Sequence, residues 1–244
     1  MSDLPYSTIA VTGEDAFEFL QAQLAADLLA LGGNAKLSRD HSARPERVAF
    51  GNSILSAWCT PKGRVICLML VGEVADGYIL TVPADLVDEI LQRLTKFRFR
   101  AKVEFDAQPA TKAQLGIDAT FEDWRLENLR AGIPEIRAAQ SEQFTPHMLN
   151  LDLLDAVSVD KGCYPGQEIV ARTHFRGATK RRCLRFESAE PVSPGAKISD
   201  GKRDVGEVLN AIGNELLAVV PVDQADAELT VNGIPLTNVA LPYL

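Results

Sequence analysis

Residues 160–185 read DKGCYPGQEIVARTHFRGATKRRCLR and combine a cysteine, several glycines, an aromatic ring, an amide and an acid with a basic tail. Between Lys161 and Arg185, seven Lys or Arg residues face a single acid, Glu168, which gives a local balance of +6. The whole chain of 244 residues carries a formal charge of −8, so the remaining residues sum to −14. Positive charge concentrated in an acidic chain indicates an anionic target.

Cys163 lies where the local sequence favours a reactive thiolate. A short helix is predicted to begin near Pro165, because proline suits the first helical position and the apolar residues Ile169 and Val170 follow. The positive end of this helix and the Lys161 ammonium both favour a thiolate at Cys163. The alternative is a glycine-punctuated loop around a buried cysteine, which is where most cysteines lie. The residue types on both sides favour a functional cysteine.

The other residues of this run have the chemistry to bind a flat, polar heterocycle. Gly162 and Gly166 allow a tight backbone whose amides can approach a ligand. Tyr164 offers a ring for stacking, while Gln167 and Glu168 offer hydrogen-bond donors and acceptors. The basic tail that follows comprises Arg172, Arg176, Lys180, Arg181, Arg182 and Arg185. The alternative for this tail is a solvated connector between a helix and a strand.

The sequence K-G-C-Y-x-G-Q-E resembles the motif of the YgfZ family, the folate-binding proteins of iron–sulfur (Fe–S) cluster assembly and repair. All seven fixed positions match between Lys161 and Glu168, with Pro165 in the variable position. This family is similar in fold to the T-protein of the glycine cleavage system, a tetrahydrofolate-dependent aminomethyltransferase. The opening V-x-G-x-D-A-x-x-F-L-Q-x-Q-L, from Val11 to Leu24, also resembles the family.

The resemblance implies a folate site in which Cys163 is the catalytic residue and tetrahydrofolate, a reduced folate, is the cofactor. The residues expected to bind the cofactor are Lys161, Gly162, Tyr164, Gly166, Gln167, Glu168, Arg172, Arg176 and Arg64. Arg64 belongs to a K-G-R turn that resembles the family's turn. Without the resemblance, Lys62 and Arg64 are ordinary surface charges beside a hairpin. No metal ligands are expected.

Strand and helix patterns predict an α+β fold. The expected strands are Ile54–Cys59, Val65–Val71, Tyr78–Val82 and Ala101–Phe105, with a helical stripe from Leu86 to Phe97 and a turn at Thr60–Gly63. This order of three strands, a helix and a strand predicts a ferredoxin-like subdomain, inserted at about residues 36–107.

Further elements are predicted on both sides of that subdomain. Thr12 is expected to cap a helix whose leucines recur at helical spacing as far as Leu31, before Gly32-Gly33 ends it. A short strand is expected at Ala113–Ile117 and a helix at Phe121–Ala131.

The sequence pattern of the last 60 or so residues differs from that of the preceding chain. Short β-prone runs alternate with turn signals at Asp200-Gly201 and Asn232-Gly233, which predicts a small all-β barrel over residues 181–244. Residues 1–180 are expected to form the folate-binding α+β body. Together with the resemblance, this implies a T-protein-like aminomethyltransferase folate-binding fold, with two ferredoxin-like subdomains and a C-terminal β-barrel.

Hydrophobicity and cysteine content indicate the cellular location of the protein and whether it can hold an Fe–S cluster. No apolar run approaches the roughly 20 residues that span a bilayer, so no membrane association is expected. The first residues lack the basic and apolar regions of a secretory signal, which favours a cytoplasmic location. The four cysteines, Cys59, Cys67, Cys163 and Cys183, are scattered without a C-x-x-C pair. This pattern is typical of a reduced compartment and poor for holding a cluster.

Three functions are consistent with these features. The first is a tetrahydrofolate-binding protein that supports assembly or repair of Fe–S client proteins, including tRNA-modifying enzymes. The second is a folate-dependent aminomethyl or one-carbon transferase. The third is a thiol redox protein built on Cys163, with Cys183 as the resolving thiol. Direct nucleic-acid binding is disfavoured, because phosphate binding needs a broad basic surface and the chain is at −8. A monomer is expected.

Overall fold

The computed structural model describes residues 4–31, 52–177, 179–225 and 227–244. Two compact units divide the chain. Unit 1 comprises Met1–Asp118, Ile136–Pro146 and Leu151–Arg172, and unit 2 comprises Ala119–Glu135, His147–Asn150 and Thr173–Leu244. Ala119–Glu135 therefore groups with the segments of the C-terminal barrel.

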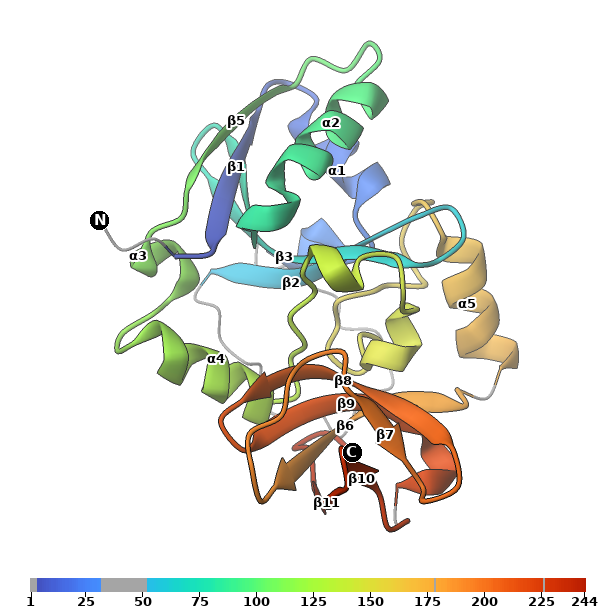
Figure 1. Cartoon of the computed structure of the whole chain (residues 1–244). Helices are drawn as coiled ribbons and strands as arrows, with labels where there is room; N and C mark the ends of the chain where they lie inside the picture. Colours follow the sequence, from blue (N-terminus) through green and yellow to red (C-terminus); the bar gives the residue numbers. More distant parts are fainter. Residues whose placement is uncertain (1–3, 32–51, 178, 226) are drawn as a thin grey trace. The chain divides into compact units, whose positions relative to one another are not determined.

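Unit 1 is built on a five-stranded antiparallel sheet with the strand order β2-β3-β4-β1-β5 (Figure 1). Its strands are β1 (Tyr6–Thr12), β2 (Ser53–Cys59), β3 (Val65–Val74), β4 (Gly77–Pro83) and β5 (Glu104–Pro109). Without β2 at its edge, the order of strands and helices is that of one ferredoxin-like unit. The described residues thus form one such unit rather than the two that were expected.

The N-terminal strand β1 explains this difference. It lies between β4 and β5 and pairs with both, so it shares the sheet with the segment that was expected to be a separate subdomain. In this register Ile9 lies opposite Leu80, and Val11 lies opposite Tyr78, so the apolar residues of both strands face the same core. The predicted start of the subdomain, near residue 36, lies outside the described residues.

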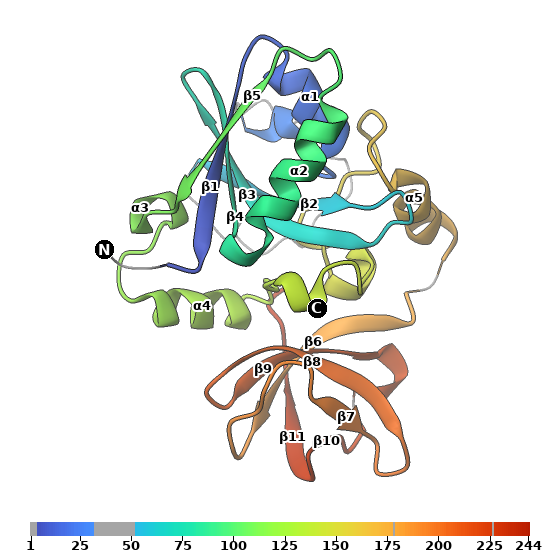
Figure 2. The same ribbon diagram turned by 45° about the horizontal axis from the view of Figure 1, so that its top comes forward.

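Two helices complete the core of unit 1, α1 (Ala16–Gln23) and α2 (Val87–Phe97). Leu20 of α1 and Ile90 and Leu94 of α2 are fully buried in one hydrophobic cluster with Ile9 and Leu80 of the sheet. These positions recur at helical spacing, so each helix buries a single apolar stripe. In Figure 2, α2 crosses the sheet beside β1 and β4.

Helix α1 is shorter than predicted. It begins after Asp15 rather than at Thr12 and ends at Gln23, because Leu24 adopts an extended conformation and forms a β-bridge with Trp58. The side chain of Asp27 then accepts a hydrogen bond from the Leu29 amide and starts a separate 3₁₀ turn. Gly32-Gly33 lies outside the described residues.

Two further predictions in unit 1 were wrong. The strand expected at Ala101–Phe105 begins at Glu104, because the Ala101 amide donates to the Arg98 carbonyl and closes a turn. The strand expected at Ala113–Ile117 is instead the helix α3 (Lys112–Leu115). A capping box between Thr111 and Gln114 nucleates it.

Unit 2 contains a closed antiparallel barrel with the order β10-β11-β6-β9-β8-β7 (Figure 2). Its strands are β6 (Arg181–Ser188), β7 (Lys197–Ser199), β8 (Asp204–Ile212), β9 (Glu215–Pro221), β10 (Thr230–Val231) and β11 (Ile234–Val239). The predicted turn at Asn232-Gly233 joins β10 to β11 with φ values of 51° and 81°, both in the left-handed region that such two-residue turns require. The remaining short helices of the chain are 3₁₀ turns at Leu28–Ala30, Ala84–Leu86, Ala138–Gln140, Pro146–Leu149 and Val222–Gln224.

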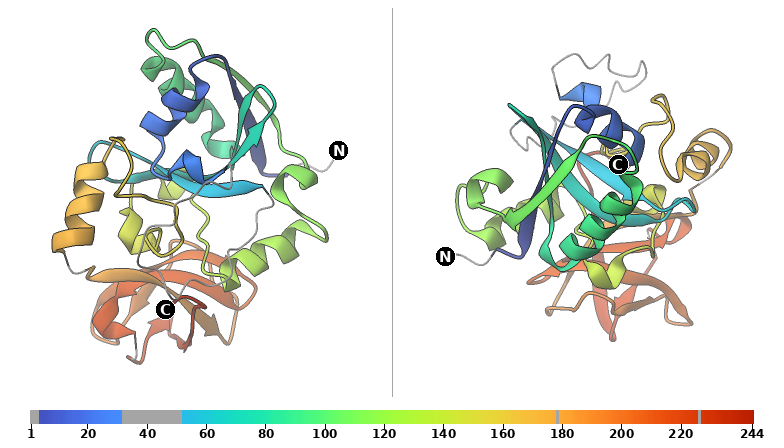
Figure 3. Two further views of the ribbon diagram at one scale, coloured as in Figure 1. Left: turned by 180° about the vertical axis from the view of Figure 1, so that it is seen from behind. Right: turned by 90° about the horizontal axis from the view of Figure 1, so that it is seen from above.

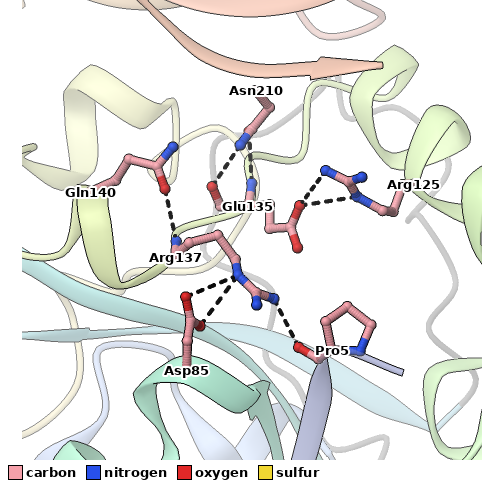
Figure 4. A network of polar contacts seen from close by, with 7 residues as sticks. All are labelled: Pro5, Asp85, Arg125, Glu135, Arg137, Gln140 and Asn210. Atoms are coloured by element: carbon pink, nitrogen blue, oxygen red, sulfur yellow. Dashed lines mark hydrogen bonds and ion pairs between the residues drawn. The ribbon is translucent and has the colours of Figure 1, made fainter. Parts of the chain in front are cut away.

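Polar contacts fix the segments around each unit's core (Figure 4). In unit 2, helix α4 (Phe121–Arg130), which was predicted, is followed by Glu135, whose backbone exchanges two hydrogen bonds of 2.8 Å with the Asn210 side chain of β8. The Arg125 guanidinium binds the Glu135 carboxylate at 2.9 Å. In unit 1, Arg137 binds Asp85 and donates to the Pro5 carbonyl at 2.8 Å.

Candidate functional site

The loop that contains the K-G-C-Y-x-G-Q-E motif, residues 161–168, is anchored at its first residue. The Lys161 ammonium donates to the backbone carbonyls of Leu24 and Ala26, both at 2.8 Å. It also lies 5.5 Å from the centroid of the Tyr164 ring. Burial lowers the pKa of Lys161 to about 8, and the charge of Asp27 acts weakly in the opposite direction. Lys161 therefore joins the loop to residues 24–26, a role that the sequence did not indicate.

The segment that receives Lys161 is itself held by side chains of the N-terminal pattern. Gln21 donates to the Asp27 carboxylate at 2.8 Å and accepts from the Leu28 amide at 3.0 Å. These bonds fix the backbone just after Ala26. Gln21 belongs to the opening pattern that resembles the YgfZ family, and the structure gives this residue a physical role in that pattern.

Two residues expected to contact a ligand instead stabilise the loop. Tyr164 is only 6% exposed, and its hydroxyl donates to the Ser158 carbonyl at 2.8 Å. Burial, more than the nearby Cys59, raises the pKa of the Tyr164 hydroxyl. The Gln167 amide donates to the Lys161 carbonyl at 3.0 Å and closes the loop on itself. The expected stacking role of Tyr164 is corrected, because its ring lies in the interior.

Two glycines hold the loop against the hairpin turn between β2 and β3. Gly166 has φ 85°, and a Cβ there would lie 2.5 Å from the Thr60 carbonyl oxygen. Gly63 has φ 67°, and a Cβ there would lie 2.8 Å from the Cβ of Ile169. Both positions therefore require glycine on two grounds, backbone conformation and close approach. The next residue, Arg64, donates to the Gln143 carbonyl at 2.7 Å, so its guanidinium binds backbone within unit 1.

The helix after the loop is α5 (Gln167–Arg176), drawn in light orange in Figure 3. It begins later than predicted. Pro165 does not occupy its first position, because Gly166 follows with a left-handed φ that no helix continues. Cys163 is therefore four residues before the first helical residue. The expected effect of the helix end on this thiol is correspondingly weaker, since it falls off within the first turn.

The remaining motif residues are exposed. They are Gly162, Cys163 and Glu168 in the loop, and Arg172 and Arg176 on α5. Around Gly162, no described atom lies within 4 Å of the position that a Cβ would take, so there is open space beside Cys163.

The four cysteines divide sharply by environment. Cys163 is exposed, whereas Cys59, Cys67 and Cys183 are buried. Burial raises the pKa of the Cys59 and Cys183 thiols to about 12. Burial also raises the pKa of Cys67, with a smaller contribution from Cys59. Since the thiolate is the reactive form, burial makes these three thiols unreactive at neutral pH.

The distal part of the basic tail is structural. Arg181 donates to the Val219 carbonyl at 3.1 Å, and Arg185 pairs with Glu215 at 2.6 Å, both within the barrel. Arg182 donates to the Asn150 side chain at 3.1 Å. Asn150 is fully buried, and its side-chain amide donates to the Cys183 carbonyl of β6. The connector alternative therefore describes these three arginines.

Neither a metal-binding cluster nor a membrane-spanning helix occurs in the described part of the chain. No group of three His, Cys, Asp or Glu residues there is arranged to hold a metal ion. None of the helices that the structure describes combines the length and apolar character needed to cross a bilayer.

Comparisons with known proteins agree with this geometry. The family model of the CAF17 C-terminal β-barrel domain matches residues 180–242, which contain the closed barrel. The glycine cleavage system aminomethyltransferase T of Bartonella henselae has a similar fold, with a TM-score of 0.66 over 98% of this chain and 84% of that protein at 15% identity. This likeness confirms the predicted T-protein-like fold.

Sequence relatives extend along most of the chain. A Haemophilus influenzae protein described as uncharacterised is 27% identical over 98% of this chain and 95% of its own length. The tRNA-modifying protein YgfZ of Vibrio vulnificus is 26% identical over 86% of this chain and 76% of its own length. With the motif, the barrel and the fold, these relatives show that the chain is similar to proteins of the YgfZ family and has a T-protein-like fold.

Proposed function

We propose that this protein binds tetrahydrofolate and supports the assembly or repair of Fe–S proteins, including enzymes that modify tRNA. Cys163 is the catalytic residue in this proposal. The observation that carries this proposal is one exposed thiol in a loop whose other residues are fixed by hydrogen bonds and close packing. Lys161, Tyr164, Gly166 and Gln167 are all committed to holding the loop. Such a support holds Cys163 in place without itself contacting the ligand.

The exposed residues fit a folate in their chemistry. The Glu168 carboxylate can accept hydrogen bonds from the amino and N–H edge of a pterin, and Arg172 and Arg176 can bind the carboxylates of the glutamate tail. Gly162 leaves room for the ligand beside Cys163. When bound, tetrahydrofolate supplies a carrier for one-carbon groups. Arg64 and Tyr164 act indirectly in this proposal, by positioning the loop and its neighbours.

A second candidate function is a folate-dependent aminomethyl or one-carbon transferase. It is supported by the likeness in fold to an aminomethyltransferase. The two functions differ in one assay, because a transferase turns over an aminomethylated carrier protein whereas a maintenance factor does not. Cys163 favours the maintenance role, because a cysteine at this position belongs to the YgfZ motif that the chain resembles.

The thiol redox function receives less support. Redox exchange needs a resolving thiol, and burial raises the pKa of Cys183 to about 12. A fully buried thiol is also hard for a partner disulfide to reach. Stoichiometric formation of a Cys163–Cys183 disulfide with peroxide would revive this alternative.

The proposal is tested by complementation of a strain that lacks the native protein. Cys163→Ser should fold with an unchanged melting temperature but fail to restore Fe–S enzyme activity. The matched control is Cys59→Ser, which should restore activity after a modest loss of stability of about 1 kcal/mol. Complementation by Cys163→Ser as full as that of the wild type would overturn the assigned role.

A further inference from the structure

A second feature of unit 1 combines charge with aromatic surface, at the junction between α2 and β5. Residues 96–102 read KFRFRAK, so four cations alternate with two phenylalanines and an alanine. This segment, the α2–β5 turn, carries +4 in a chain of −8. Lys96 to Arg100 are exposed in succession, and Phe99 is 88% exposed. The turn lies at the start of β5, where the chain passes from α2 into the sheet (Figure 1).

Phe99 adopts an unusual backbone conformation at the tip of this turn. The Ala101 amide donates to the Arg98 carbonyl at 2.8 Å, and Phe99 follows Arg98 with φ 44°. A bulky residue at positive φ is a genuine outlier, and such strain concentrates at sites of binding or catalysis. An exposed ring contributes little to folding, so stability alone does not account for Phe99.

A cavity of about 450 Å³ adjoins this turn, lined by Thr12–Glu14 and Arg98–Glu104. Its two walls approach each other closely at Gly13, where a Cβ, if present, would lie 2.1 Å from the Lys102 carbonyl oxygen. The Lys102 amide also donates to the Asp15 carboxylate at 2.7 Å. The cavity volume lies in the range of small-molecule sites.

Some of the charged side chains around the cavity are paired with each other, and others are exposed to a ligand. The Lys102 ammonium pairs with Glu14 at 2.6 Å, so these two charges largely cancel. Arg98 and Arg100 remain exposed beside Phe99, and Glu104 is the other acid in the lining. Two guanidinium groups beside an exposed ring match a ligand that has both a phosphate and a flat base.

We propose that the α2–β5 turn and its cavity bind a nucleotide unit, with the phosphate held by Arg98 and Arg100 and the base stacked on Phe99. The ligand is a free mononucleotide or a nucleotide within single-stranded RNA, which share this chemistry. The net charge of −8 disfavours a broad nucleic-acid surface, but a site for one nucleotide needs only local cations. This site involves none of the residues assigned to folate binding or to Cys163, so the nucleotide proposal is tested independently of the folate proposal.

Fluorescence anisotropy with a fluorescein-labelled single-stranded RNA of about 12 nucleotides tests this proposal, with AMP and inorganic polyphosphate as competitors. Phe99→Leu should weaken RNA binding by about tenfold or more, whereas Phe99→Tyr, which keeps a ring, should retain it. Arg100→Ala should reduce the slope of log K against log salt by about 0.7. Lys202→Ala, an exposed cation in the barrel, is the matched control and should change neither quantity.

The competitors separate the two sources of the nucleotide. If AMP competes as well as RNA of equal nucleotide concentration, the ligand is a free nucleotide; if RNA binds much more tightly, the ligand is a strand. The proposal is overturned if polyphosphate binds as tightly as RNA and Phe99→Leu has no effect. Failure of both RNA and AMP to bind at low salt would overturn it equally. A loss of binding caused by Phe175→Leu instead of Phe99→Leu would move the site to α5 and contradict the assignment.

Discussion

Gly63 and Gly166 meet backbone to backbone, so that a Cβ on Gly166 would lie 2.9 Å from the Cα of Gly63. One glycine belongs to the turn between β2 and β3, and the other to the loop that presents Cys163. The hairpin therefore determines where the loop lies. Neither glycine needs to touch a ligand to be required by the site.

Gly166→Ala should destabilise the protein by about 2 kcal/mol or more, because the new methyl group meets the Thr60 carbonyl and the backbone keeps a positive φ. The matched control is Gly162→Ala, which should change the free energy of unfolding by less than about 0.5 kcal/mol, since its Cβ points into open space. Urea unfolding measures both. Equal effects of the two substitutions would contradict the described packing.

Alkylation should distinguish Cys163 from the other three cysteines. Iodoacetamide at neutral pH should modify Cys163 in the native protein and leave Cys59, Cys67 and Cys183 unmodified, because burial protects them and raises their thiol pKa. Mass spectrometry of peptides identifies the sites, and the same reaction in urea should modify all four. If Cys163 stayed unmodified in the native protein, it would have to be reassigned to the core.

Lys161 should give stability a specific dependence on pH. Its pKa is about 8 in the folded protein and ordinarily 10.5, so between these values the unfolded chain binds the extra proton. The Lys161 contribution to the free energy of unfolding therefore rises with pH across this window, on the order of 1 kcal/mol per pH unit. Lys161→Met removes this contribution.

The measurement is urea unfolding of the wild type and Lys161→Met at several pH values from 7 to 10. The advantage of the wild type should grow between about pH 8 and pH 10. The buried thiols and Tyr164 have raised pKa values, so their contributions to the free energy of unfolding fall as pH rises. These contributions are the same in both proteins and cancel when the two free energies are subtracted. Parallel curves for the two proteins would show that Lys161 is not buried as described.

The basic tail should divide into a structural and a ligand-binding part. Arg185→Ala should cost about 2 kcal/mol, because it removes a partner of Glu215 where both side chains are only 14% exposed. The matched control, Arg176→Ala, should cost less than about 0.5 kcal/mol, because that side chain lies on the exposed surface of α5. Thermal unfolding compares the two variants. The reverse order would contradict this division.

Features with local signals were predictable from the sequence. The hairpin at Thr60–Gly63, the helix after Thr120 and the turn at Asn232-Gly233 each depend on residues within a few positions of one another. The barrel and the T-protein-like fold followed from such signals and from the resemblance to a family.

Features that depend on distant parts of the chain were not predictable. Lys161 binds carbonyls 137 and 135 residues earlier in the chain, and β1 enters the sheet between two later strands. Tyr164 has the residue type of a stacking platform, but its burial depends on tertiary packing that leaves no periodic pattern. Cys163, Glu168 and Arg172 were expected from the motif as site residues, and the structure places all three at the surface.

Calorimetric titration of the protein with tetrahydrofolate tests the central claim most directly. Saturable binding is expected, which strengthens with the number of glutamates on the folate, weakens with salt and is reduced in the double variant Arg172→Ala, Arg176→Ala. Cys163→Ser should still bind, because the proposed folate contacts are those of Glu168, Arg172 and Arg176 rather than the thiol. The absence of binding by any reduced folate at about millimolar concentration would contradict the account.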